Sequence, residues 1–286
     1  RSSSAAWWSS GCGSVAASSL IALPGCHAAA QKRTLFPQSV RAPTRWPSAG
    51  IKWPTKPKGE RRAYIWAMEQ LDLTPDQLLS TTRAVRKRLD MDRPVPDDAI
   101  RECVAMAMQS PSGSNNMTMQ FVVVRDEAKR RAIGDIYRQC FDVYRSMDGV
   151  YAGSIKKETE EAQAQQMRVT DSAEYLAEHM GDAPVLVIAC SKAGRLDNVP
   201  AMRAASSMGN VLPAMWSFML AARARGLGTC WTTVGLMMEQ QIADVVGIPY
   251  DEVQQACLTP IAYTKGTDFK PAGRADPDTI IHWDTW

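Results

Sequence analysis

The stretch Thr82-Arg83-Ala84-Val85-Arg86-Lys87-Arg88 places four cations within seven residues. Further along the chain, Pro111-Ser112-Gly113-Ser114-Asn115-Asn116 forms a run of small residues. Small residues leave backbone N–H groups accessible, and cations together with free N–H groups are the donors that a phosphate-bearing ligand requires. Taken alone, the first stretch is equally consistent with a solvated basic turn, and the second with an ordinary loop that ends a helix.

The composition is that of a globular protein, with 45% apolar and 22% charged residues among 286. No apolar run is long enough to cross a membrane as a helix. The net charge of +3 is unevenly distributed: residues 1–67 hold ten basic residues and one acid, whereas residues 68–286 hold 23 basic and 29 acidic residues. The body of the chain is therefore mildly acidic, which argues against nucleic-acid binding.

Residues 1–67 are expected to lie outside the folded domain. They are rich in Ser, Ala, Pro, Arg and Trp and show no helical or strand period. We interpret them as a disordered or non-native basic leader; the alternatives are an organelle transit peptide and a secretory signal around Val15–Leu23. The domain is predicted to span residues 68–286.

The cysteines and histidines indicate the redox compartment and whether a metal site is expected. The seven cysteines are odd in number, none is spaced C-x-x-C, and five lie in apolar segments. This pattern predicts buried thiols in a reducing, cytoplasmic compartment. The histidines, His27, His179 and His282, are far apart in the sequence, so no metal site is predicted.

Helix and strand signals begin near Leu71. Thr74-Pro75-Asp76-Gln77 has the pattern of a capping box and predicts the start of a short helix. From Asp97 onwards, apolar residues recur at helical spacing and predict one buried face. Further helices are predicted around 133–144, 201–225 and 238–246, and strands at 121–124, 185–190, 229–233, 256–263 and 279–283.

Two predicted elements stand out. Residues 185–190 are apolar on both faces and predict a central strand, whereas residues 201–225 form a helix that is apolar nearly all round and needs burial on several sides, for example at a subunit interface. Pro213 is expected to kink this helix or to mark a shift in its start, and Gly226 to end it. Residues 148–180 are polar and predict either a lid or a plain surface helix. The pattern predicts an α+β fold with one central sheet.

Common catalytic motifs are absent from the sequence. There is no G-x-S-x-G and no Walker A motif, and Gly226-Leu227-Gly228 follows a helix and precedes a strand, the wrong order for a dinucleotide fingerprint. If the protein is an enzyme, a cofactor is expected to carry the chemistry.

Several motifs, in order, resemble the nitroreductase family of FMN-dependent oxidoreductases, with the nearest likeness to its actinobacterial nitroaromatic-reducing members. They are Arg83-Ala84-Val85-Arg86, Arg93-Pro94-Val95-Pro96, Ser110-Pro111-Ser112-Gly113-Ser114-Asn115 before Phe121-Val122-Val123-Val124, Ala221 to Trp231, and the ending with Lys270-Pro271, Arg274 and His282-Trp283. The resemblance implies a mainly antiparallel central sheet flanked by helices, in an intertwined homodimer with FMN at the interface.

The resemblance also implies roles for individual residues. Arg86 corresponds to the cation beside flavin N1 and O2, where reduction places negative charge, and Arg83, Lys270 and Arg274 correspond to phosphate ligands. A backbone N–H near Gly235 corresponds to the donor to flavin N5, and the partner subunit supplies the 111–115 loop. The implied cofactor-binding residues are Thr82, Arg83, Ala84, Arg86, Pro111, Ser112, Gly113, Ser114, Asn115, Trp231, Thr232, Thr233, Val234, Gly235, Lys270 and Arg274. No catalytic side chain is implied, because flavin N5 carries the reaction.

Three departures from the family pattern concern the site. Many members have Arg where this chain has Thr82 and Ser where it has Ala84, so one phosphate or ring contact is in doubt. The family often has Gln-Pro-Trp where this chain has Met117-Thr118-Met119. The expected substrate wall is therefore less aromatic.

The implied activity is hydride transfer from NADPH or NADH, through FMN, to a nitroaromatic or quinone-type acceptor by a ping-pong mechanism. One alternative keeps the fold with other flavin chemistry: dehalogenase or deiodinase-like, dehydrogenase or flavin-fragmenting. A second is a non-enzymatic flavin-binding protein. A third, a nucleic-acid binder that uses residues 1–67, would require salt-sensitive binding.

Overall fold

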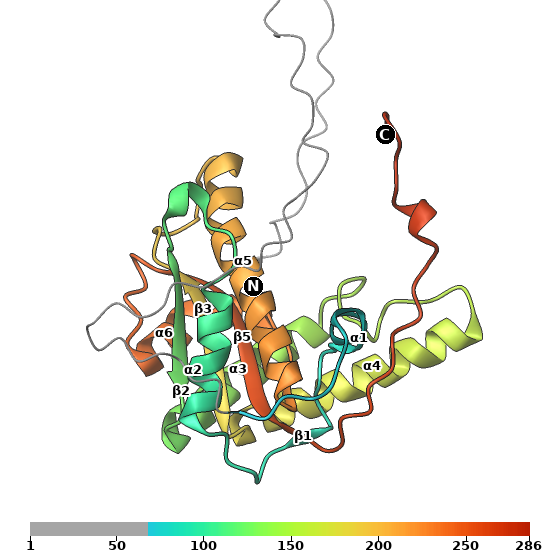
Figure 1. Ribbon diagram of the computed structural model, residues 1–286, viewed down its shortest axis with the longest axis horizontal. Helices are drawn as coiled ribbons and strands as arrows, with labels where there is room; N and C mark the ends of the chain where they lie inside the picture. The colour runs from blue at the N-terminus through green and yellow to red at the C-terminus, as the bar shows by residue number, and fades with distance from the viewer. Residues whose placement is uncertain (1–67) are drawn as a thin grey trace, which may run out of the picture. The chain divides into compact units, whose positions relative to one another are not determined.

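The computed structural model describes residues 68–286, so the predictions for residues 1–67 lie outside the described part. Helices and strands follow one another along this part of the chain (Figure 1). The helices are α1 (Pro75–Thr81), α2 (Asp97–Ala107), α3 (Glu127–Arg145), α4 (Glu160–His179), α5 (Ala201–Ala224) and α6 (Glu239–Val246). The strands are β1 (Leu89–Asp90), β2 (Met119–Val124), β3 (Val185–Ser191), β4 (Leu227–Thr229) and β5 (Gln254–Thr264). Short 3-10 turns are η1 (Gly113–Asn115), η2 (Met180–Asp182), η3 (Val234–Met238) and η4 (Pro277–Thr279).

The strands form one sheet in which every strand pair is antiparallel. Its order is β1-β5-β3-β2, and β4 also pairs with β5. An isolated bridge between Ala84 and Thr229 is parallel. The prediction of a central, mainly antiparallel sheet flanked by helices is confirmed.

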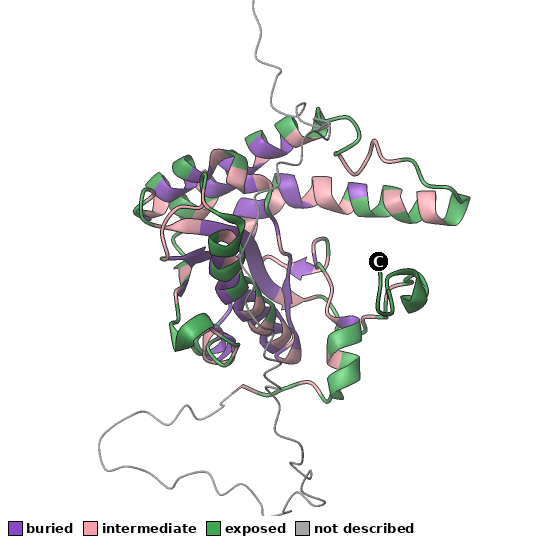
Figure 2. Ribbon diagram, turned by 90° about the horizontal axis from the view of Figure 1, so that it is seen from above, coloured by how far each residue is buried: buried purple, intermediate pink, exposed green. Residues whose placement is uncertain are grey.

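Strand β3 lies between β2 and β5, and each of its seven residues is buried. Figure 2 shows that the strands at the centre of the domain are largely coloured as buried. Because successive side chains of a strand point to opposite faces, β3 contributes to two cores. Leu186 and Ile188 join the core formed with α3 and α6, whereas Val185 and Val187 join the core formed with α2 and α5. This explains the run of apolar residues that predicted a central strand.

The local helix signals are also confirmed. The Thr74 side chain accepts a hydrogen bond from the Gln77 N–H, and the Gln77 side chain accepts one from the Thr74 N–H, which completes the capping box. In α2, the residues at helical spacing that include Ile100 and Cys103 face the core. Gly226 follows α5 with φ of +73°, a backbone conformation that favours glycine.

Helix α5 begins at Ala201 and runs through Pro213 as one helix, so Pro213 does not mark a shift in its start. In the single chain, Met202, Leu212 and Trp216 of α5 are 82%, 38% and 40% exposed, so this side of the helix is not covered by residues 68–286. The uncovered side of α5 thus carries large apolar residues.

Two strand predictions are wrong. Strand β4 ends at Thr229 rather than Thr233, because Thr232 turns to pair with Leu258 and η3 begins two residues later. Residues 279–283 form no strand: within 68–286 they pair with no sheet edge, and a strand requires partners for its backbone groups. Ile280 and Trp283 in this tail are 79% and 80% exposed. The predicted polar helix within 148–180 is α4.

Candidate cofactor site

The cationic stretch 82–88 leaves α1 and runs beside β4. The Val85 N–H donates a 2.8 Å hydrogen bond to the Thr229 carbonyl, and the Val85 side chain is buried in the core. Gly228 makes this approach possible, because a Cβ there would lie 3.0 Å or less from Val85, Leu89 and Thr264. Burial of Val85 fixes the backbone from which Arg83 and Arg86 extend.

Arg83 and Lys270, two predicted phosphate ligands, lie together. Arg83 Nη1 donates a 2.8 Å hydrogen bond to the Lys270 carbonyl oxygen. Arg274 is exposed, and its Nη1 donates to the adjacent Gly273 carbonyl at 3.3 Å. The structure therefore brings Arg83 to the backbone of Lys270 and leaves Arg274 in the C-terminal tail.

Two further arginines hold the same segment, residues 265–270. Arg88 Nε donates to the Lys265 carbonyl at 2.9 Å, and its Nη2 pairs with Asp268 at 2.6 Å. Arg223 of α5 donates from Nη2 to the Thr267 carbonyl at 3.0 Å. Three guanidinium groups, those of Arg83, Arg88 and Arg223, thus converge on one short segment.

Arg223 is a buried cation without an ion-pair partner among the described residues. Its exposure is 4%, and its Nε and Nη1 groups donate to nothing in residues 68–286. Burial, followed by the nearby charge of Arg88, lowers the pKa of Arg223. A buried charge with unused donors is unfavourable. An anion beside these arginines would relieve the excess charge, and the donor set therefore fits a phosphate group.

Arg86 points toward a different part of the fold. Its Nη1 donates to Ser172 Oγ of α4 at 3.3 Å. Burial raises the pKa of the Cys230 thiol, and Arg86 opposes that rise through its charge and a hydrogen bond. Burial and the neighbouring Cys230 raise the pKa of Tyr137. A hydrogen bond with Thr232 and the charge of Arg86 act in the opposite direction and lower this pKa. Arg86 therefore lies beside the start of the predicted 231–235 segment.

That segment is anchored on β5. Thr232 exchanges backbone hydrogen bonds of 3.1 and 2.9 Å with Leu258, and its hydroxyl donates to the same carbonyl at 2.7 Å. A Cβ at Gly235 would lie 3.1 Å from Ile242 Cδ1 and 3.6 Å from the Tyr137 ring. The missing side chain of Gly235 faces the core, so a larger residue here would crowd Ile242 of α6.

The 111–115 loop lies with α5. Ser114 and Asn115 have φ of 55° and 53°. Asn210 Nδ2 of α5 donates to the Asn116 carbonyl at 2.9 Å, and Gly113 lies beside Ser206. Within residues 68–286, the loop is closed by hydrogen bonds from the Asn115 and Asn116 N–H groups to the Ser112 and Gly113 carbonyls, its neighbour Asn116 is held by α5, and no hydrogen bond joins residues 111–115 to the cationic stretch. Within one chain, Arg83 therefore meets the Lys270 segment, and Arg86 lies near the 231–235 segment. The 111–115 loop is joined to neither of these two groups by a hydrogen bond within residues 68–286.

A model of the nitroreductase family matches residues 79–263. The chain belongs to the nitroreductase family. The match includes the cationic stretch, the 111–115 loop and the 231–235 segment, and it ends before Lys270 and Arg274. The predicted family is confirmed.

Solved structures of nitroreductase-family proteins share the fold. Iodotyrosine deiodinase bound to FMN and 3-iodo-L-tyrosine has a TM-score of 0.54 at 19% identity, over 73% of this chain and 98% of that chain. The FMN and NADPH-dependent nitroreductase NfnB from Sphigopyxis sp. strain HMH has a TM-score of 0.52 at 19% identity, over 75% and 100%. A BluB-like flavoprotein from Clostridium difficile 630 has a TM-score of 0.52 at 16% identity, over 74% and 99%.

Three cavities in the described part of this nitroreductase-family chain, of about 370, 390 and 470 Å³, lie beside α2, beside residues 68–71 and beside α6. None of these three is lined by a predicted cofactor-binding residue. Of the predicted substrate wall, Met117 is 43% exposed, whereas Met119 is buried at the start of β2. Among residues 68–286, no three His, Cys, Asp or Glu side chains are grouped to hold a metal ion, and no helix is long and apolar enough to cross a membrane.

Sequence reasoning missed Arg88 and Arg223 as members of the site. Both lie within quoted motifs, but only the fold shows that they reach the 265–270 segment. The signal available was the pair of arginines in Ala222-Arg223-Ala224-Arg225, where an apolar helix ends in two cations. Arg225 proves to be the partner of the buried Glu102, at 2.7 Å.

Proposed function

We propose that this chain is a cytoplasmic, FMN-dependent oxidoreductase of the nitroreductase type, with NADPH or NADH as reductant. Membership of the nitroreductase family supports the class of reaction. When bound, FMN would accept hydride at N5 from NAD(P)H and pass it to a nitroaromatic or quinone-type acceptor in a ping-pong cycle. The five described cysteines are free and buried, which agrees with a reducing compartment.

The observation that carries the proposal is the excess of cationic donors around residues 265–270. Arg83, Arg88 and Arg223 converge there, and two donors of Arg223 are unused. A phosphate dianion accepts several charge-assisted hydrogen bonds at once. Arg83, Lys270 and Arg274 would hold the FMN phosphate directly, and Arg223 would add positive potential from the interior.

Arg86 would provide the second electrostatic contribution. Its position beside Cys230 puts a fixed cation next to the 231–235 segment, where the flavin ring is proposed to lie. A cation held in place before reaction stabilises the negative charge that reduction puts on N1 and O2, without reorganisation during the step. The backbone N–H groups of 233–235 would orient the ring at N5. No side chain is required as a proton donor or nucleophile.

A homodimer would complete the site. The 111–115 loop stays on α5, away from the cations of its own chain. The uncovered side of α5 bears Leu212 and Trp216, and the C-terminal tail bears Ile280 and Trp283 in the solvent. Such apolar surface is typical of a subunit interface. Analytical ultracentrifugation should therefore find a dimer, and deletion of 275–286 should shift it towards monomer; a monomeric full-length chain that binds FMN tightly would contradict this arrangement.

Cofactor titration tests the proposal. Protein freed of bound flavin should bind FMN more tightly than riboflavin, which has the same ring system and no phosphate. Equal affinities for FMN and riboflavin would mean that the arginines do not bind the phosphate of FMN. Failure to bind either would remove the flavoenzyme assignment altogether.

A second chemistry on the same fold is kept as an alternative because iodotyrosine deiodinase shares it. The reduced protein should be mixed anaerobically with a nitroaromatic, a quinone and 3-iodo-L-tyrosine, and its reoxidation followed in the visible. Fast reoxidation by the nitroaromatic or quinone supports the proposal. Fast reoxidation by the iodinated amino acid alone supports a deiodinase-like enzyme, and bound flavin that NAD(P)H does not reduce supports a flavin-binding protein.

A further inference from the structure

Residues 232–239 form an arch that is attached to β5 at both ends. At the first end, Thr232 pairs with Leu258 through two backbone hydrogen bonds. At the second end, Glu239 accepts two hydrogen bonds from Gln255. The Glu239 backbone carbonyl accepts one from Gln255 Nε2 at 2.8 Å, and the Glu239 carboxylate accepts one from the Gln255 backbone N–H at 2.7 Å. The turn η3 spans the interval between these anchors. The geometry of the arch therefore depends on both attachments.

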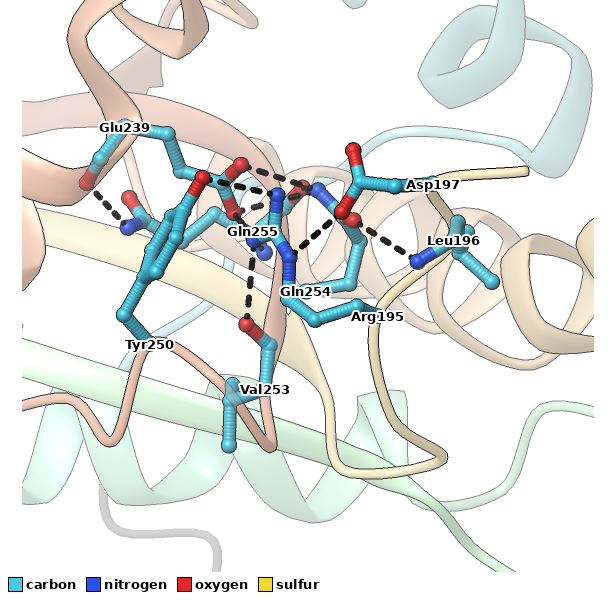
Figure 3. Close-up of polar contacts among 8 residues, drawn as sticks. All are labelled: Arg195, Leu196, Asp197, Glu239, Tyr250, Val253, Gln254 and Gln255. Carbon is cyan, nitrogen blue, oxygen red and sulfur yellow. Dashed lines mark hydrogen bonds and ion pairs between the residues drawn. The ribbon is translucent and has the colours of Figure 1, made fainter. Parts of the chain in front are cut away.

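Glu239 makes the second attachment through a buried carboxylate, which is 8% exposed (Figure 3). One oxygen accepts from the Gln255 N–H, and both lie within 3.1 Å of Gln254 Nε2. Arg195 Nη1 pairs with the same carboxylate at 2.9 Å. A buried carboxylate in a polar network is stable in this position because a cation neutralises it.

Arg195 is itself held on several sides. It extends from the loop after β3 and pairs with Asp197 through Nε at 2.9 Å. Its Nη2 donates to the Tyr250 hydroxyl at 3.1 Å, and its guanidinium lies 4.1 Å from the centre of the Tyr250 ring. With its donors engaged inside the protein, Arg195 acts as an internal brace rather than as a ligand site. The brace joins the β3 loop, the first turn of α6 and the start of β5.

We infer that Arg195 and Glu239 are positioning residues for the arch, whose backbone N–H groups are proposed to meet flavin N5. The inference rests on the proposed function for its catalytic consequence but not for its structural content. Glu239 lies directly after η3, so a displaced first turn of α6 would move the N–H groups of residues 233–238. The pair would thereby set the rate of hydride transfer without touching the cofactor.

The first measurement needs no flavin. Amide hydrogen exchange of a peptide covering 232–238 should be compared in the full chain, in Arg195→Met and in Glu239→Gln. Exchange should quicken by about tenfold in both variants, because loss of a brace lowers the free energy of local opening. Arg131→Met is the matched control, since Arg131 of α3 makes exposed ion pairs with Glu127 and with Asp182 of η2, away from the arch. Unchanged exchange in both brace variants would overturn the inference.

The second measurement uses FMN-loaded protein. The rate of flavin reduction at saturating NAD(P)H should fall about tenfold in each variant, while the Kd for FMN stays within about threefold. A parallel loss of FMN affinity and melting temperature with an unchanged reduction rate would indicate a purely structural role and overturn the inference. The double variant should be no slower than the slower single variant, because the two residues act as one unit.

The inference stays testable if Arg195→Met does not fold or if the wild-type protein binds no FMN. If Arg195→Met does not fold, Arg195→Lys keeps the charge but loses the planar donor fork, and it should give the same changes to a smaller degree. If the wild-type protein binds no FMN, the proposed function fails, and the exchange measurement alone decides whether Arg195 and Glu239 hold the arch.

Discussion

Arg83 donates a hydrogen bond from Nη1 to the carbonyl oxygen of Lys270 at 2.8 Å, across 187 residues of chain. Arg88 and Arg223 donate to carbonyls of the same segment. The cationic stretch near the start of the domain, the end of α5 and the segment after β5 thus meet at one place. That meeting supplies the concentrated positive charge that a phosphate-bearing cofactor requires.

The Arg83 contact predicts how phosphate recognition responds to substitution. Arg83→Gln should weaken FMN binding by about tenfold or more, because a charge-assisted hydrogen bond contributes ~1.5–3 kcal/mol. Riboflavin binding should hardly change. Fluorescence titration of both flavins measures the difference, with Arg138→Gln, on the exposed face of α3, as control. An equal loss for both flavins would mean that Arg83 acts on the fold rather than on the phosphate.

Arg86 gives a prediction about the flavin ring. Arg86→Ala should weaken FMN binding and lower the reduction potential of the bound flavin, because the fixed cation stabilises the charge of the reduced form. Equilibration with a reference dye measures the potential. If both quantities stay at their wild-type values, the placement of Arg86 beside N1 and O2 is wrong.

Glu102 and Arg225 form a buried ion pair at 2.7 Å, with side chains 4% and 3% exposed. Glu102→Gln should lower the free energy of unfolding by about 3–5 kcal/mol, because it removes the negative charge that lies against the buried guanidinium of Arg225. Asp97→Asn, which breaks the exposed pair with Arg125, should cost about 1 kcal/mol or less. Urea denaturation of the two variants measures both values, and similar losses would contradict the distinction between buried and exposed pairs.

The buried thiols predict instability in alkali. Burial raises the pKa of Cys103 and Cys190 to about 12 and that of Cys257 to about 11, from 9.0. Between pH 9 and 11 the unfolded chain therefore binds fewer protons than the folded one, and the free energy of unfolding falls as pH rises. Each thiol contributes a slope of up to ~1.4 kcal/mol per pH unit. Urea midpoints measured under reducing conditions should show a shallower decline for Cys257→Ala, and an identical decline would exclude Cys257 as a source.

The elements with strong local signals were predictable from the sequence. The capping box at Thr74, the helical stripe of α2 and the doubly apolar strand β3 each express a pattern that packing then preserves. The strand predicted at 279–283 fails for the opposite reason. Apolar residues such as Ile280 and Trp283 indicate a need for burial, but a strand forms only where another strand offers its edge.

The site was predictable in part. The resemblance named Arg83 and Lys270, and the fold brings them together. The roles of Arg223 and of the Arg195–Glu239 pair could not be predicted from the sequence, because they arise from contacts between distant elements. Gly235 shows a further limit: a glycine that seemed reserved for a ligand also has a packing reason, its closeness to Ile242.

The visible absorption spectrum of the purified protein, recorded before and after anaerobic addition of NADPH, is the first test of FMN-dependent chemistry in this chain. We expect oxidised-flavin bands that bleach on reduction, with FMN released by heat. A colourless protein that takes up no added FMN would contradict this expectation.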